Sequence, residues 1–232
     1  NVFANHQSFA DYQIPDKSYV KTSRFEGIGA KFLLGYNKKK WVTKLGYNYS
    51  NNTIGIPGHT HDTLATKNSF LRQNQVREEG RPSQKIQNHL LSFDNQFFFH
   101  NSNLKVTLAQ SINRLEEYEK FTIPMIGVDL ATSSYYIRYK YKLTKDMTWI
   151  VGLQGMYQQN KNNSISEEQL IPNFNQLDNG VFGVLSGKYN KLNYQIGVRA
   201  DNRNIDLDNS NNGNFTYSKI KSVEFIPESH IK

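Results

Sequence analysis

The chain contains no cysteine, which excludes disulfide bonds, cysteine-ligated zinc, iron–sulfur clusters and thiol catalysis within its 232 residues. It also lacks long apolar runs. Hydrophobic residues make up 37% of the sequence, and no stretch approaches the roughly eighteen consecutive apolar residues of a transmembrane helix. Aromatic residues, in contrast, reach 13%. This combination favours strands with one amphipathic, aromatic-rich face over a thick two-sided core.

The apolar residues that are present alternate with polar ones. In the clearest instance, residues 25–50, two alternating segments meet at the polar turn Asn37–Lys40, which is the pattern of a β-hairpin with one apolar and one polar face. The same pattern recurs, and it predicts four hairpins: 25–36 with 41–50, 86–99 with 104–114, 128–142 with 148–158, and 179–189 with 192–201. We expect a ninth strand from about Phe215 and a loop over residues 1–24.

The connections between these strands are of two kinds. Short turns join the strands within each hairpin, whereas the long polar segments 51–85, 115–127, 159–178 and 202–214 join successive hairpins. Transmembrane barrels have this asymmetry, with short periplasmic turns and long extracellular loops. Aromatic residues also gather at the strand ends beside the short turns, where a membrane-interface girdle lies. The sequence therefore predicts an all-β, antiparallel transmembrane β-barrel, with residues 1–232 forming part of one barrel domain.

Two alternatives remain open. A soluble β-sandwich binding module would use the aromatic residues to pack a core between two sheets. A small eight-stranded barrel with a structural or passive role would close on the eight predicted strands alone.

Candidate chemistry is sparse, and we expect no enzyme, catalytic residue or cofactor. The cluster His59–Asp62 offers two imidazoles and a carboxylate, but solvation is the favoured interpretation and we predict no metal site. Glu116, Glu117 and Glu119 are expected to form ion pairs with Arg114 and Lys120 rather than a hydrolytic pair. No nucleophile elbow and no phosphate-binding glycine loop occur.

The formal net charge of +8 suits an anionic partner. Nucleic acid is not expected, because on Tyr135–Lys142 most aromatics and all cations fall on opposite faces. In a barrel the cations would point into the lumen, to pair with a plug domain or attract an anionic ligand. These cations are Lys31, Lys44, Lys105, Arg138, Lys140, Lys142 and Arg199.

Several short segments resemble the barrel of TonB-dependent outer-membrane receptors of Bacteroidetes-type bacteria. They are Asp11-Tyr12, Ile54–Pro57, Ser83–His89, Asn113–Glu117, Leu170–Phe174, Asp178–Gly183 and Gly197–Asp201. The last departs from the usual Gly-x-Arg-Tyr-Asp at Ala200, and Asn113–Glu117 lacks the second Arg and the Phe of its counterpart.

The resemblance implies a barrel of about twenty-two strands with an amino-terminal plug, of which this chain would be an interior slice. It further implies import of a scarce nutrient, with a ferric siderophore or similar chelate favoured, and partnership with TonB through a plug outside this sequence. The location would be the Gram-negative outer membrane, in contact with lipid and lipopolysaccharide. The expected ligand-binding residues are His59, His61, Arg77 and Arg81, all in the longest loop.

Overall fold

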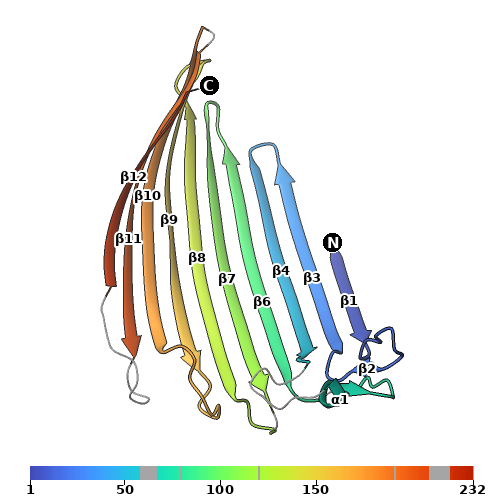
Figure 1. Ribbon diagram of the computed structural model, residues 1–232. Helices are drawn as coiled ribbons and strands as arrows, with labels where there is room; N and C mark the ends of the chain where they lie inside the picture. Colours follow the sequence, from blue (N-terminus) through green and yellow to red (C-terminus); the bar gives the residue numbers. More distant parts are fainter. Residues whose placement is uncertain (58–66, 79, 120, 191, 209–219, 232) are drawn as a thin grey trace.

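A computed structural model describes residues 1–57, 67–78, 80–119, 121–190, 192–208 and 220–231. Ten strands form one antiparallel sheet, in the order β1-β3-β4-β6-β7-β8-β9-β10-β11-β12 (Figure 1). They are β1 (Val2–Phe9), β3 (Phe25–Lys38), β4 (Trp41–Gly55), β6 (Ser83–Phe98), β7 (Ser102–Tyr118), β8 (Ile126–Lys142), β9 (Met147–Asn162), β10 (Asn173–Tyr189), β11 (Leu192–Asp208) and β12 (Ile220–Ile231). The sheet is a curved up-and-down meander, and β1 and β12 are its two end strands.

A small structure lies at the long-loop end of the sheet, at the bottom of Figure 1. It contains the short helix α1 (Lys67–Phe70) and a two-stranded sheet of β2 (Tyr19–Val20) and β5 (Leu71–Arg72). Within the described residues, no helix is long and apolar enough to cross a membrane.

All eight strands of the four predicted hairpins are confirmed, and a ninth predicted strand is present as β12. Its predicted start near Phe215 lies outside the described residues. The prediction of a loop over residues 1–24 was wrong, because β1 pairs with β3 along its whole length and β2 pairs with β5. The predicted long loops were also too long: β7 continues to Tyr118, β9 to Asn162 and β11 to Asp208. These extensions are mostly polar, and their apolar residues Leu115, Ile205 and Leu207 fall on the polar face, so the alternation that marks the apolar face does not continue into them.

The sheet has almost no hydrophobic core. Among the described residues, the buried apolar side chains are Val20, in the small loop structure, and Pro124, between β7 and β8, and neither belongs to the sheet. The accessible surface is 16006 Å², whereas a compact protein of this mass would expose about 10,800 Å². A soluble β-sandwich buries its apolar residues between two layers, so this arrangement is not a sandwich.

Most of the apolar side chains of the sheet instead lie exposed on one of its faces, here called the apolar face. Leu34, Leu108, Leu153, Val181 and Ile196 expose 46–59% of their surface on it. Because strand residues alternate, their neighbours in sequence form the opposite, polar face. There, side chains hydrogen-bond across strands; Asn88, for example, donates to Ser50 Oγ (3.1 Å) and accepts from Asn113 (2.6 Å).

On each strand the apolar face carries a run of apolar side chains, and together these runs form the apolar band. The position of this band shifts along the strands from one strand to the next. On β3 it runs from Ile28 to Tyr36, and on β11 from Leu192 to Ala200. The cross-strand register places Val198 of β11 in the same row as Lys38 of β3. The centre of the band therefore moves by about eight residues over the seven steps between these strands. With ~3.3 Å per residue and ~4.8 Å between strands, this is a tilt of about 38°, inside the range of transmembrane barrels.

Candidate functional site

The structure describes two of the four predicted ligand residues, Arg77 and Arg81, and both lie at the long-loop end. His59 and His61 lie outside the described residues. Arg77 is exposed and donates a hydrogen bond from Nη1 to the carbonyl oxygen of Ser8 (3.2 Å). Arg81 lies over the ring of Tyr118, 5.5 Å from its centroid. Both arginines thus make contacts that hold the long loops to the sheet, and their role in ligand binding stays a prediction.

Of the two partners expected for the glutamates near the end of β7, Lys120 lies outside the described residues. Within the described residues, no ion pair joins Arg114 to Glu116 or Glu117. Glu116 accepts a hydrogen bond from the Tyr118 hydroxyl (2.9 Å), and Glu117 accepts one from Gln84 (3.1 Å). Arg114 pairs with Asp129 of β8 through two hydrogen bonds of 2.8 and 3.1 Å. In the part of the chain that the structure describes, no three His, Asp or Glu side chains converge on a potential metal site.

A buried carboxylate organises the loops at this end. Asp11 is fully buried, and its Oδ1 accepts a hydrogen bond from the backbone of Ser23 (3.0 Å). Arg24 Nη1 lies 3.5 Å from Oδ1, and Arg72 Nη2 lies 3.2 Å from Oδ2. The backbone N–H of Asp11 also donates to Val76 (3.0 Å). The Asp11 side chain therefore ties the segment after β1 to the start of β3 and to β5, and its backbone adds a link to the segment between β5 and β6. Sequence reasoning missed it because a lone Asp in a polar loop gives no signal of burial.

The polar face carries two ion pairs on β10 and β11. Arg203 donates to Asp178 from Nη2 (2.8 Å) and from Nε, and Arg199 contacts Asp201 through two atoms at 2.5 Å each. The two carboxylates and two guanidinium groups line a polar hollow together with Tyr136 of β8. These four charges neutralise one another, so this part of the polar face offers no net charge to a ligand.

A second group of cations on the same face has no carboxylate partner among the described side chains. Lys105 of β7 lies directly opposite Arg138 of β8, and Lys140 and Lys142 continue the row along β8 on the same face. Where the structure describes side chains, none of these four forms an ion pair with a carboxylate, and the Nε of Arg138 is buried without a hydrogen-bond partner. Like charges opposite one another destabilise a sheet. This row, the cationic strip, is therefore suited to an anionic partner outside the described chain.

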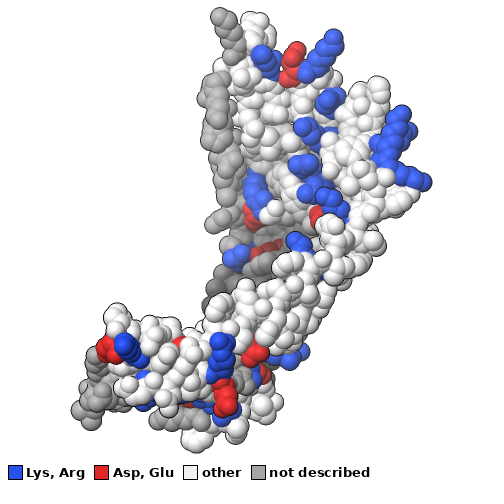
Figure 2. Space-filling view, turned by 90° about the vertical axis from the view of Figure 1, so that its right-hand side faces the viewer, with Lys and Arg blue, Asp and Glu red and all other residues white. Residues whose placement is uncertain are grey.

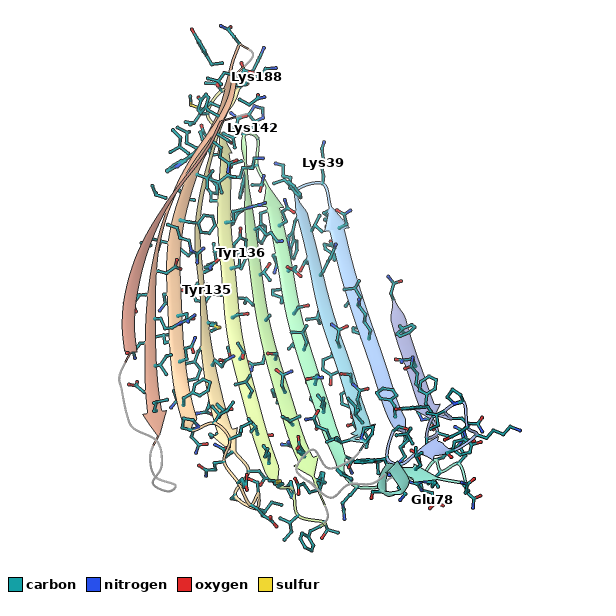
Figure 3. The ribbon with its side chains drawn as sticks, viewed as in Figure 1. Lys39, Glu78, Tyr135, Tyr136, Lys142 and Lys188 are labelled. Atoms are coloured by element: carbon teal, nitrogen blue, oxygen red, sulfur yellow. The ribbon has the colours of Figure 1, made fainter. Side chains whose placement is uncertain are left out.

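The two faces are separated cleanly on β8, where the neighbours Tyr135 and Tyr136 project from opposite sides (Figure 3). Tyr135 leans over Gly155 on the apolar face, and its hydroxyl donates to Asn179 Oδ1 (2.9 Å). Tyr136 stacks on Phe182 on the polar face, with ring centroids 6.0 Å apart.

No protein-family model matches the sequence, and no curated protein matches it. Among solved structures, the chain is similar to a copper transporter, OprC, with a TM-score of 0.65 and 12% sequence identity. The match covers 99% of this chain and 37% of that one, so the chain spans little more than a third of its structural neighbour. At this identity the likeness shows the fold alone. It agrees with the predicted fold class: the sheet is part of the wall of an antiparallel β-barrel.

Proposed function

We propose that this chain is part of the wall of an outer-membrane β-barrel transporter. Its apolar face would contact lipid, its polar face would line the interior, and its long loops would extend from the cell surface. The observation that carries the proposal is the exposed apolar band, which drifts along the strands at the tilt of a membrane barrel. In water, an apolar surface of this extent would drive aggregation.

The two alternatives fit the sheet less well. A β-sandwich requires a second layer over the apolar face, and in the described residues that face is exposed. An eight-stranded closed barrel requires its end strands to pair, whereas this sheet has ten strands with β1 and β12 at its ends.

We further propose that the whole transporter imports a metal-containing nutrient with energy from TonB. TonB dependence, a ferric siderophore or similar chelate as substrate, and the relation to Bacteroidetes-type receptors rest on the short sequence motifs alone. The structural neighbour bears the name of a copper transporter, which supports metal-linked transport and favours no siderophore. The long loops with Arg77 and Arg81 would face the incoming nutrient.

The cationic strip would then lie inside the barrel. Four cations without a carboxylate partner among the described side chains favour an interior occupant that brings negative charge. Acidic side chains of a plug domain are the preferred occupant, and an anionic nutrient passing through is the alternative.

Membrane fractionation and transport test these proposals in two stages. The full-length protein, expressed in a Gram-negative host, should sediment with outer membranes and migrate faster on gels when unheated than when boiled. Cells carrying it should accumulate a radiolabelled iron chelate or copper only when TonB is present. Recovery in the soluble fraction would contradict the barrel, whereas outer-membrane insertion without TonB-dependent uptake would contradict only the transport mechanism.

A further inference from the structure

The positive charge of the chain is concentrated at one end of the sheet. Four segments form the short-turn hairpin ends: residues 36–44, 94–106, 138–151 and 185–196. They contain eleven of the 28 Lys and Arg residues but only two of the 20 Asp and Glu. The rest of the chain holds the remaining 17 cations and 18 anions, so the net charge of +8 arises entirely at the short-turn end.

At the tips of these hairpins the lysines are exposed. Lys38, Lys39, Lys40 and Lys145 lie at or beside the turns, and no ion pair with a carboxylate is formed by any of them within the described residues. Figure 3 shows Lys39, Lys142 and Lys188 at this end, with Glu78 at the opposite end. In Figure 2, Lys and Arg outnumber Asp and Glu over the upper half of the visible face.

A belt of aromatic side chains adjoins these lysines on the apolar face. Tyr36, Trp41 and Trp149 expose 45%, 38% and 45% of their surfaces beside the turns. Tyr36 meets Trp41 edge-on at 5.6 Å, and the Nζ of Lys38 lies 5.6 Å from the centre of the Tyr36 ring. From the middle of the sheet outward, the order is therefore apolar band, aromatic belt, exposed lysines.

This order matches the layers of one membrane leaflet. Aliphatic side chains suit acyl chains, aromatic rings suit the interface, and lysines extend past them to the headgroups. An acidic protein partner would be attracted by the lysines, but it would give no reason for the aromatic belt and apolar band to continue from them. Anionic headgroups account for all three layers, since each lysine near an anionic surface adds to membrane affinity.

We propose that the short-turn end of this barrel wall selectively binds the phosphate headgroups of anionic phospholipids, through Lys38, Lys39, Lys40 and Lys145 above the aromatic belt. The proposal rests on the membrane location proposed above. It adds that anionic phospholipids preferentially surround the barrel at this end.

Spin-labelled lipids measure this selectivity directly. The full-length protein is reconstituted into phosphatidylcholine vesicles containing either spin-labelled phosphatidylglycerol or spin-labelled phosphatidylcholine, and electron paramagnetic resonance gives the fraction of each lipid held at the protein surface. The expected result is a preference for phosphatidylglycerol that disappears in 0.5 M salt, where charge interactions are screened.

Two double variants locate the effect. Lys39→Gln with Lys40→Gln should lower the preference by up to about fivefold per lysine. Lys17→Gln with Lys161→Gln removes the same charge from exposed positions at the long-loop end and should leave the preference unchanged. Equal retention of the two lipids by the unaltered protein would overturn the proposal, as would equal losses in the two double variants. Failure to enter vesicles at all would instead contradict the proposed membrane barrel.

Discussion

Two glycines on the apolar face differ in how closely other atoms approach them. A Cβ added at Gly155 would lie 2.6 Å from the carbonyl oxygen of Asp178 and 2.7 Å from the hydroxyl of Tyr135. At Gly183, on the same face, the nearest atom would be 4.0 Å away. Gly155 is thus required by close approach, and Gly183 is not.

Substituting these two glycines tests that difference. Gly155→Ala should lower the free energy of unfolding by about 1–3 kcal/mol, because the Tyr135 ring must leave and its hydrogen bond to Asn179 is lost. Gly183→Ala should change it by less than about 0.5 kcal/mol. Urea titration of the full-length protein in lipid vesicles measures both, and equal effects would contradict the packing described here.

Burial determines how much the ion pair of Asp11 contributes to the stability of the loops. Asp11→Asn would leave Arg24, whose side chain is 8% exposed, without its counter-charge, and should weaken the loop structure by about 3 kcal/mol. Opening on this scale would speed tryptic cleavage after Arg72 and Arg77 about a hundredfold. Asp129→Asn removes the exposed partner of Arg114 and should cost less than about 1 kcal/mol. If both variants resist trypsin like the unaltered protein, Asp11 does not organise the loops.

At the scale of the strands, alternation in sequence was a good guide wherever one face is apolar. Strand β7 is predictable from the sequence because every second side chain, as in Leu104, Val106 and Leu108, belongs to the apolar band. The guide failed at β1, where Asn5, His6 and Gln7 place polar groups on both faces. The candidate site was harder to predict from the sequence. Periodicity placed Lys105 and Arg138 on one face, but only the cross-strand register shows that they lie opposite one another.

A charge placed on either face of β7 distinguishes lipid from water. Leu108 exposes 46% of its surface on the apolar face, so Leu108→Arg would be harmless if that face met water. Facing lipid, it should destabilise the folded barrel by about 2–4 kcal/mol. Ser111→Arg, three residues away on the polar face, should be tolerated. Refolding yields into vesicles and urea unfolding provide the comparison, and a neutral Leu108→Arg would count against contact with lipid.

At the scale of the whole molecule, the described part of the chain is mainly one sheet, with an apolar face, a polar face and almost no buried hydrophobic core. In the proposed membrane location, lipid would cover its apolar side chains and so allow them to stabilise the fold. The cationic strip, which has no carboxylate partner among the described side chains, would then require an anionic occupant on the other side. The sequence reveals the barrel class through its turn and loop lengths. The substrate is not encoded in those patterns, because it depends on how loops from the entire barrel converge.

The most direct test of this account is the environment of alternate residues along β7. Since the chain has no cysteine, single cysteines at positions 104 to 111 can carry a spin label in the full-length protein, with any cysteine outside this chain replaced. In vesicles, labels at positions 104, 106 and 108 should be accessible to oxygen dissolved in lipid, and those at 105, 107 and 109 to a water-soluble nickel complex. Accessibility that alternates with a period of two residues is the predicted result. Uniform accessibility of all positions to the nickel complex would contradict the membrane barrel.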